Sequence, residues 1–151
     1  AGGMAWLWFN LTPLGWFDFE PSAGTVFWLL FSIVLTILVH ELLHAAAHPK
    51  NDSNGTSIIG FWPAKVVFYA AYLGPVSRNR FLFTLMLPLM VISVLPLLLA
   101  AFFQFGSAWA AYISIVNVAL ASGDIFGALL VGWQVSRSAT ICNQRSRTFW
   151  K

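Results

Sequence analysis

Long apolar runs, separated by short polar stretches, dominate this chain. Residues 25–47, 81–103 and 108–135 are each long enough to cross a bilayer, which takes about 20 predominantly apolar residues. Glu41 and Asp124 are the only charged residues inside these runs. The pattern therefore predicts an all-α membrane protein whose three transmembrane helices belong to a single domain.

The N-terminal residues 1–24 are rich in aromatic side chains but have no regular period. Pro13, Gly15 and Pro21 interrupt them, so no stretch is long enough to span a bilayer. We expect an interfacial lead-in to the first helix. We expect no cleavable signal, because no basic segment precedes an apolar one.

Residues 48–80 are the longest polar connection. Residues 56–61 and 65–72 are rich in β-branched and aromatic side chains, and Pro63 separates them. Two short strands are one interpretation. They would form a re-entrant β-hairpin whose edge could pair with an extended substrate. A loop lying in the membrane interface is the equally weighted alternative.

The second span contains Pro88 and Pro96. Proline inside a helix removes a hydrogen bond and kinks the helix, so we expect bends at both positions. The kinks either make room for a cavity or only shape helix packing. Residues 136–151 are polar and basic, and we expect them to form a tail outside the membrane.

The composition of residues 1–151 supports a membrane protein. Hydrophobic residues make up 59% of the chain and charged residues 9%, and the mean hydropathy is +0.77, whereas soluble domains carry about 25% charged residues. A single cysteine, Cys142, excludes an internal disulfide and a cysteine-based metal site. The isoelectric point near 9.4 reflects membrane topology, so we expect no nucleic-acid partner.

The positions of the charges predict the orientation. All eight lysines and arginines lie in residues 48–80 and 136–151, whereas Asp18 and Glu20 precede the first span. By the positive-inside rule, the N-terminus lies outside and the loop and C-terminus lie in the cytoplasm.

The first span ends in the motif H-E-x-x-H, formed by His40, Glu41 and His44. On a helix, the two histidines share a face one turn apart, and two such imidazoles can bind one Zn²⁺. Glu41 lies beside that face, where it could accept a proton from a water molecule. The alternative is a polar cluster that holds helices together or lines a cavity.

Asp124 is the strongest candidate for a third ligand. It lies in the middle of the third span, and no span contains a basic partner for it. A buried carboxylate without a partner would protonate or bind a cation. Asn117, seven residues earlier, could contact substrate, orient a ligand or join two helices. His48 and Ser122 are weaker candidates for contacting substrate or a metal ligand.

The chain also resembles a known family. His40 to His44 resembles the motif of membrane zincins of the site-2 protease class. The wider pattern, from about residue 25 to 151, is similar to the zincin peptidase family of small bacterial and archaeal membrane proteins. The matching features are the H-E-x-x-H at a helix end, Ser77–Phe81, a proline-bearing second span, Asn117 with Ser122-Gly123-Asp124, and Arg147–Trp150.

The resemblance implies an integral protein of the prokaryotic cytoplasmic (inner) membrane. It implies a zinc site of His40, His44 and Asp124, with Glu41 as the base. In this chain Gly123 precedes Asp124, which reverses the aspartate–glycine order of proven intramembrane proteases. The resemblance therefore supports the site more strongly than the activity.

Two functional hypotheses follow. The first is an intramembrane zinc metallopeptidase that hydrolyses a peptide bond of a membrane protein segment. The second is a non-catalytic accessory subunit of a larger membrane complex, with a structural or vestigial zinc site. The lipid bilayer is the surrounding partner in both. A metal transporter is a weaker third idea, because the spans offer no second acidic residue along a path.

Overall fold

The computed structural model describes residues 1–14, 22–49, 57–63, 67–144 and 147–151. The chain divides into two compact units. The first unit contains Ala1–Leu38 and Leu89–Ala121, and the second contains Val39–Pro88 and Ser122–Lys151. The predicted interfacial residues Asp18 and Glu20 lie outside the described residues.

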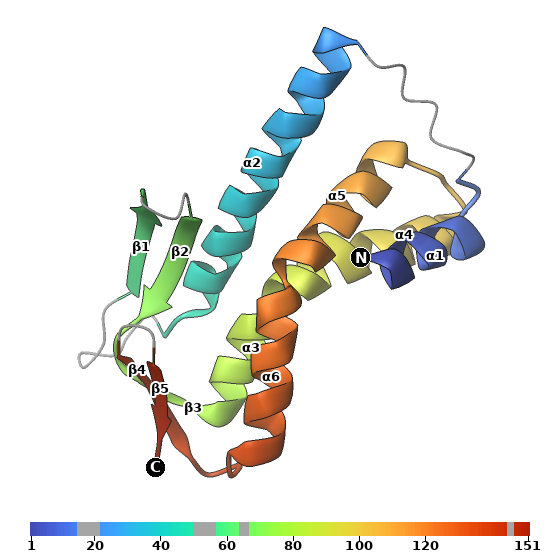
Figure 1. The fold of residues 1–151 in the computed structure, drawn as a ribbon. Helices are drawn as coiled ribbons and strands as arrows, with labels where there is room; N and C mark the ends of the chain where they lie inside the picture. Colours follow the sequence, from blue (N-terminus) through green and yellow to red (C-terminus); the bar gives the residue numbers. More distant parts are fainter. Residues whose placement is uncertain (15–21, 50–56, 64–66, 145–146) are drawn as a thin grey trace. The chain divides into compact units, whose positions relative to one another are not determined.

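Most of the described chain is helical (Figure 1). The helices are α1 (Gly2–Leu11), α2 (Ala23–Ala47), α3 (Arg78–Pro88), the π-helix η1 (Leu89–Val94), α4 (Leu95–Phe103), α5 (Ala108–Leu120) and α6 (Ser122–Gln134). Two helical segments, Ala23–Ala47 and Arg78–Phe103, are long and apolar enough to cross a membrane. A third span exists if α5 and α6 together count as one.

The prediction of an all-α fold was too narrow, because the second unit also contains strands. They are β1 (Ser57–Trp62), β2 (Val67–Tyr72), β3 (Pro75–Ser77), β4 (Thr140–Gln144) and β5 (Arg147–Trp150). The hairpin interpretation of the loop is confirmed, since β1 and β2 pair antiparallel from Ser57↔Tyr72 to Trp62↔Val67. The expected first residues of these strands, Thr56 and Lys65, lie outside the described residues.

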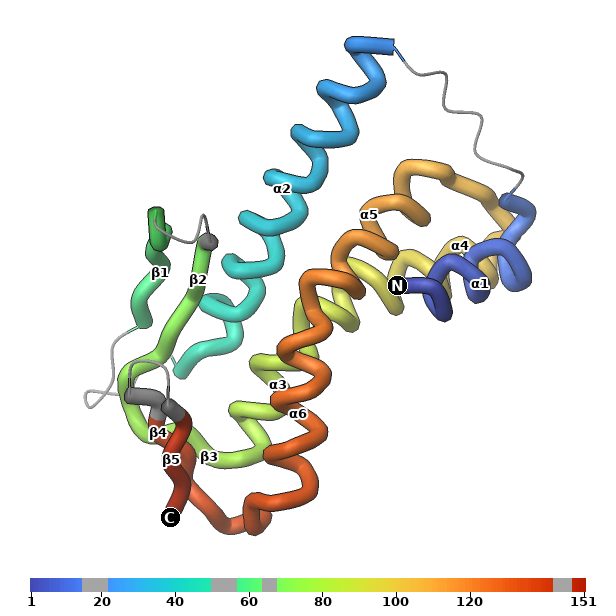
Figure 2. Tube along the Cα trace, in the orientation of Figure 1, coloured from blue at the N-terminus to red at the C-terminus, as the bar shows by residue number. Residues whose placement is uncertain are grey.

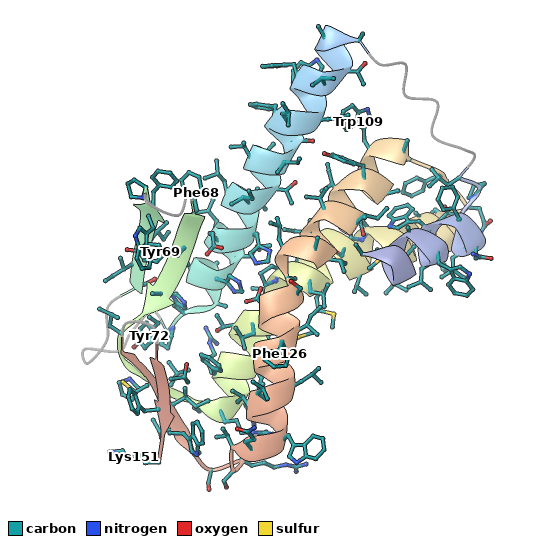
Figure 3. All side chains as sticks on the ribbon, in the orientation of Figure 1. Phe68, Tyr69, Tyr72, Trp109, Phe126 and Lys151 are labelled. Atoms are coloured by element: carbon teal, nitrogen blue, oxygen red, sulfur yellow. The ribbon has the colours of Figure 1, made fainter. Side chains whose placement is uncertain are left out.

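The β1–β2 hairpin depends on a close approach between its strands. Gly60 faces Tyr69 across the ladder, and a Cβ atom at Gly60 would lie 2.6 Å from the Tyr69 ring. The Tyr69 ring therefore lies over Gly60, and a side chain at position 60 would occupy the space of the ring. Figure 3 shows Tyr69 on β2 together with Phe68 and Tyr72.

The expectation of a polar tail was also incomplete. In the described part of that tail, β4 pairs with β3 on one side and with β5 on the other, both antiparallel (Figure 2). Ile141 on β4 is 1% exposed and packs with Val131, Val135 and Ala139. Ala139 and Ile141 of the tail thus belong to the core of the second unit, which the charge pattern alone did not indicate.

In the first unit, part of the expected lead-in forms a helix. Trp8 of α1 is fully buried against Leu97, Ala100 and Ala111. The small alanines leave room for the indole, so α1 packs on α4 and α5. The sequence did not predict this contact, because a single buried side chain on α1 produces no regular apolar period.

The second span changes helix type at its prolines. Pro88 ends α3, the π-helix η1 follows directly, and Pro96 lies in the first turn of α4. Pro96 costs no hydrogen bond, because the N–H groups of a first helical turn have no partner within the helix. At position 88, by contrast, a residue with an N–H would donate to a carbonyl of α3, and proline has none.

The segment predicted as a third span is not one continuous helix. Helix α5 ends at Leu120, and α6 begins at Ser122 after Ala121. Asp124 therefore lies in the first turn of α6 rather than in the middle of one helix. Asn117 and Asp124, seven residues apart in the sequence, therefore lie on different helices.

Replacing Ile141 by alanine should destabilise the second unit. We expect a loss of about 2–5 kcal/mol in the free energy of unfolding, because the substitution leaves a cavity in a packed core. Phe149→Ala, at a side chain 49% exposed on β5, is the control and should change stability by less than about 0.5 kcal/mol. Denaturant unfolding in detergent micelles measures both, and equal effects would contradict a tail that belongs to the core.

Candidate metal centre

Three potential metal ligands meet in the second unit. The Nε2 atoms of His40 and His44 lie 3.1 Å apart. Asp124 Oδ2 lies 3.0 Å from His40 Nε2 and 3.3 Å from His44 Nε2. Within the described residues, these are the one group of three or more histidine, cysteine or acidic side chains that could hold a metal ion.

Helix geometry explains the histidine pair. Residues four apart on an α-helix are neighbours on one face, and the two imidazole rings lie edge to face with centroids 4.8 Å apart. His40 is 4% exposed and His44 is 7% exposed. Both rings lie near the C-terminal end of α2 and are buried, whereas the apolar side chains of Val39 and Leu42 beside them are exposed.

The break at Ala121 explains the position of Asp124. The carboxylate lies in the first turn of α6, where the helix dipole and the unpaired N–H groups favour negative charge. Helix α6 packs on α3 (Figure 1). A carboxylate at the start of a helix is thus brought to two imidazoles at the end of another.

The donor atoms fit a metal ion. Ligand atoms about 2.0–2.1 Å from a tetrahedral ion are separated by about 3.3 Å, and the three separations here are 3.0, 3.1 and 3.3 Å. Two imidazole nitrogens with one carboxylate oxygen suit zinc, although such donors also accept other divalent ions. The residues present therefore fit the zinc ion predicted from the motif.

The second nitrogen of His44 is also bonded. His44 Nδ1 lies 2.9 Å from the carbonyl oxygen of Thr84 on α3. Because a carbonyl only accepts, Nδ1 carries the hydrogen of this bond. In the neutral ring, Nε2 then keeps its lone pair on the side of His40 and Asp124.

Glu41 lies next to the ligand pair in sequence, but it does not belong to the ligand group. Its Oε2 accepts a hydrogen bond of 2.7 Å from the backbone N–H of Ala70 on β2. The hairpin therefore holds this carboxylate, and α2 and β2 are joined immediately beside the histidines.

His48 does not join the ligand group either. It follows the end of α2, and its Nδ1 shares a hydrogen bond of 2.6 Å with Ser57 Oγ on β1. Its ring also lies against Tyr72, with centroids 5.6 Å apart. The contacts of His48 therefore join the end of α2 to both strands of the hairpin.

Asn117 and Ser122 have other surroundings. Asn117 belongs to the first unit, where its Nδ2 donates to Ser93 Oγ at 2.8 Å. Ser93 and Ser114 exchange hydrogen bonds between hydroxyl and carbonyl, so these contacts join η1 to α5. Ser122 begins α6 and is exposed.

Two arginines near the ligand helices were not among the predicted site residues. Arg80 donates from Nε to the Ala47 carbonyl at 2.6 Å, and from Nη2 to the His48 carbonyl at 3.3 Å. Arg78 Nη2 donates to the Gly132 carbonyl in the last turn of α6 at 2.7 Å. The last carbonyls of a helix have no partner within it, so both arginines bond to the C-terminal ends of the helices that carry the candidate ligands.

The segment Ser77–Phe81 contains the signal that could have found these arginines. Basic residues at the start of an apolar span predict membrane topology. Arginines in the first turn of such a helix can also reach the carbonyl ends of neighbouring helices.

Residues 33–140 match the model of a family described as "Putative zincin peptidase". The matched segment includes the histidine pair, Glu41, both arginines and Asp124. No curated protein and no solved structure matches the chain.

Replacing a ligand should weaken metal binding strongly. We expect His44→Ala and Asp124→Ala each to raise the zinc dissociation constant at least about 100-fold, because each removes one of three protein donors. Competition with a chromophoric chelator in detergent measures the constant. His48→Asn is the control, because it removes a nearby imidazole outside the ligand group, and its constant should stay within about threefold of the wild type.

Acid should weaken the contacts of His48. Burial, with smaller contributions from the nearby His44 and Arg80, lowers the pKa of His48 below its ordinary value of 6.5. Below pH 6.5, His48 therefore binds a proton more readily in the unfolded chain than in the folded chain. The contribution of neutral His48 to stability is complete above pH 6.5 and is lost as the pH falls through the lowered pKa. Denaturant unfolding between pH 7.5 and 5.5 should show a smaller loss of stability in His48→Asn than in the wild type. Equal losses would show that His48 does not contribute.

Proposed function

The chain belongs to the zincin peptidase family, and on this basis we propose that it is an intramembrane zinc metallopeptidase. It would hydrolyse a peptide bond in a membrane protein segment. The observation that carries the proposal is that one ligand atom each of His40, His44 and Asp124 lie within 4.8 Å of one another. Glu41 lies beside the histidine pair on α2.

His40, His44 and Asp124 would hold the zinc ion. Bound there, zinc supplies Lewis-acid activation of a water molecule and of the scissile carbonyl. The chain's own contribution is to fix three donors in a largely buried position, so that few other ligands compete for the ion.

Glu41 would move the proton. The Ala70 N–H holds Oε2, which orients the carboxylate, and Glu41 would take a proton from the attacking water. Glu41 would then pass the proton to the leaving amine, which must be protonated as the peptide bond breaks. A carboxylate in this role alternates between accepting and donating one proton in each catalytic cycle.

The location of the site supports a substrate in or beside a membrane. His40 and His44 lie in the last third of the apolar helix α2, and we place this end on the cytoplasmic side of the prokaryotic inner membrane, with the N-terminus outside. All eight lysines and arginines lie in segments that this orientation leaves in the cytoplasm. A transmembrane or membrane-adjacent segment of another protein would then reach the site from the bilayer.

An extended substrate could also pair with the β1–β2 hairpin. In the part of the chain that the structure describes, this sheet has two strands, and backbone pairing at the edge of such a sheet recognises a chain without requiring a particular sequence. Ala70 connects β2 to Glu41, so a segment approaching the hairpin from the β2 side would lie beside the residue that moves the proton.

The test is cleavage of membrane reporters. Wild-type protein and Glu41→Gln would be co-expressed with a panel of single-span proteins tagged at both ends, and fragments would be detected by immunoblotting. We expect wild-type cleavage to fall about 10²–10⁴-fold in Glu41→Gln, the range typical for loss of a general base. The zinc content of both proteins should be equal.

Equal cleavage by the wild type and Glu41→Gln would refute Glu41 as the base. Loss of zinc in Glu41→Gln would instead give the residue a structural role. A protein that cleaves no reporter but co-purifies at fixed stoichiometry with other membrane proteins, with growth unaffected by Glu41→Gln, would favour the accessory subunit.

A further inference from the structure

The Thr84 carbonyl on α3 holds the imidazole of His44 through Nδ1. In an uninterrupted α-helix, each carbonyl accepts a hydrogen bond from the N–H four residues later. For Thr84 that residue is Pro88. Proline has no N–H, so the usual donor to this carbonyl is missing.

Pro88 also acts through its ring. Inside a helix, the pyrrolidine ring clashes with the carbonyl four residues earlier and turns the backbone away from regular geometry. The α-helix ends at Pro88, and the π-helix η1 begins at the next residue. The turn that carries the Thr84 carbonyl is therefore the turn that proline disrupts.

The side chain of Thr84 does not take part in this contact. Its hydroxyl donates to the carbonyl of Arg80, four residues earlier on the same helix, at 3.0 Å. What Thr84 offers to His44 is thus its backbone carbonyl, an oxygen that no side-chain substitution at position 84 removes.

We propose that Pro88 is a positioning residue of the metal centre. By removing the helical donor to Thr84, it leaves that carbonyl to accept from His44 Nδ1, and this bond directs His44 Nε2 toward His40 and Asp124. The inference rests on the proposed role of His44 as a ligand. According to this inference, Pro88 determines which ring nitrogen of His44 binds the metal.

Packing is the alternative explanation for Pro88, because the residue is almost completely buried. A packing role predicts general destabilisation when Pro88 is replaced. A positioning role predicts a change at His44 in particular, so the two explanations differ in the protonation of one ring.

The first measurement uses metal-free protein. The ¹⁵N NMR spectrum of histidine-labelled full-length chain in detergent, above the ordinary histidine pKa of about 6.5, distinguishes protonated from unprotonated ring nitrogens. Wild-type His44 should carry its hydrogen on Nδ1. A wild-type His44 with its hydrogen on Nε2 would overturn the inference, whether or not the protein is a peptidase.

The second measurement is the zinc dissociation constant of Pro88→Ala. This substitution restores an N–H that can bond to the Thr84 carbonyl. We expect the His44 ring to lose its preference for Nδ1–H, and the zinc constant to rise about 10–100-fold, as is typical when the outer partner of a metal-binding histidine is lost.

Two matched controls complete the test. Pro96→Ala removes the other proline of the same span, in the first turn of α4, and Thr84→Val removes the hydroxyl but keeps the carbonyl. Both should leave the zinc constant within about threefold of the wild type. A Pro88→Ala protein that binds zinc like the wild type, or a Pro96→Ala protein that weakens equally, would overturn the inference.

These outcomes are separate from the failure of the proposed function. A protein in which Pro88→Ala shifts the His44 tautomer and weakens zinc binding supports the inference even if no reporter is cleaved. If Pro88→Ala does not fold, the wild-type tautomer still decides whether the Thr84 carbonyl holds His44, and Thr84→Val still tests whether its hydroxyl is needed.

Discussion

The second unit is arranged around a carboxylate oxygen held between two imidazoles. Asp124 Oδ2 lies within 3.3 Å of the Nε2 atoms of His40 and His44, and both histidines are buried. Burial of such groups costs free energy unless each one finds a partner. The end of α2 and the start of α6 must therefore meet at one point, and the surrounding elements fix that meeting.

The hydrogen bonds that hold these elements together are made with backbone groups that have no partner within their own helix or strand. Arg80 and Arg78 donate to carbonyls at the C-terminal ends of α2 and α6, where no helical donor remains. Glu41 accepts from the Ala70 N–H on β2, and His44 donates to the Thr84 carbonyl. The polar groups of the centre thus satisfy unpaired backbone groups in an otherwise apolar chain, where water is a poor substitute.

Helix α2 meets two opposite requirements. Phe27, Trp28 and Leu30 are each more than half exposed, as suits contact with lipid, whereas His40 and His44 near the other end are buried and bonded. A helix satisfies its own backbone hydrogen bonds, so its side chains can change from apolar to polar along its length without exposing main-chain groups to lipid. A helix that is apolar along most of its length can therefore carry two candidate metal ligands near one end.

The sequence determined what depends on local spacing. The apolar runs predicted membrane helices, and the spacing of His40 and His44 placed them on one face, because helix geometry links residues four apart. Asp124 was predicted as a third ligand because no span contains a basic partner for it. Tertiary structure alone decided that α6 starts beside Asp124, that the tail forms strands around Ile141, and that the Thr84 carbonyl reaches His44. The strands of the tail and the bond between Thr84 and His44 depend on contacts between segments distant in the chain, which no local pattern encodes.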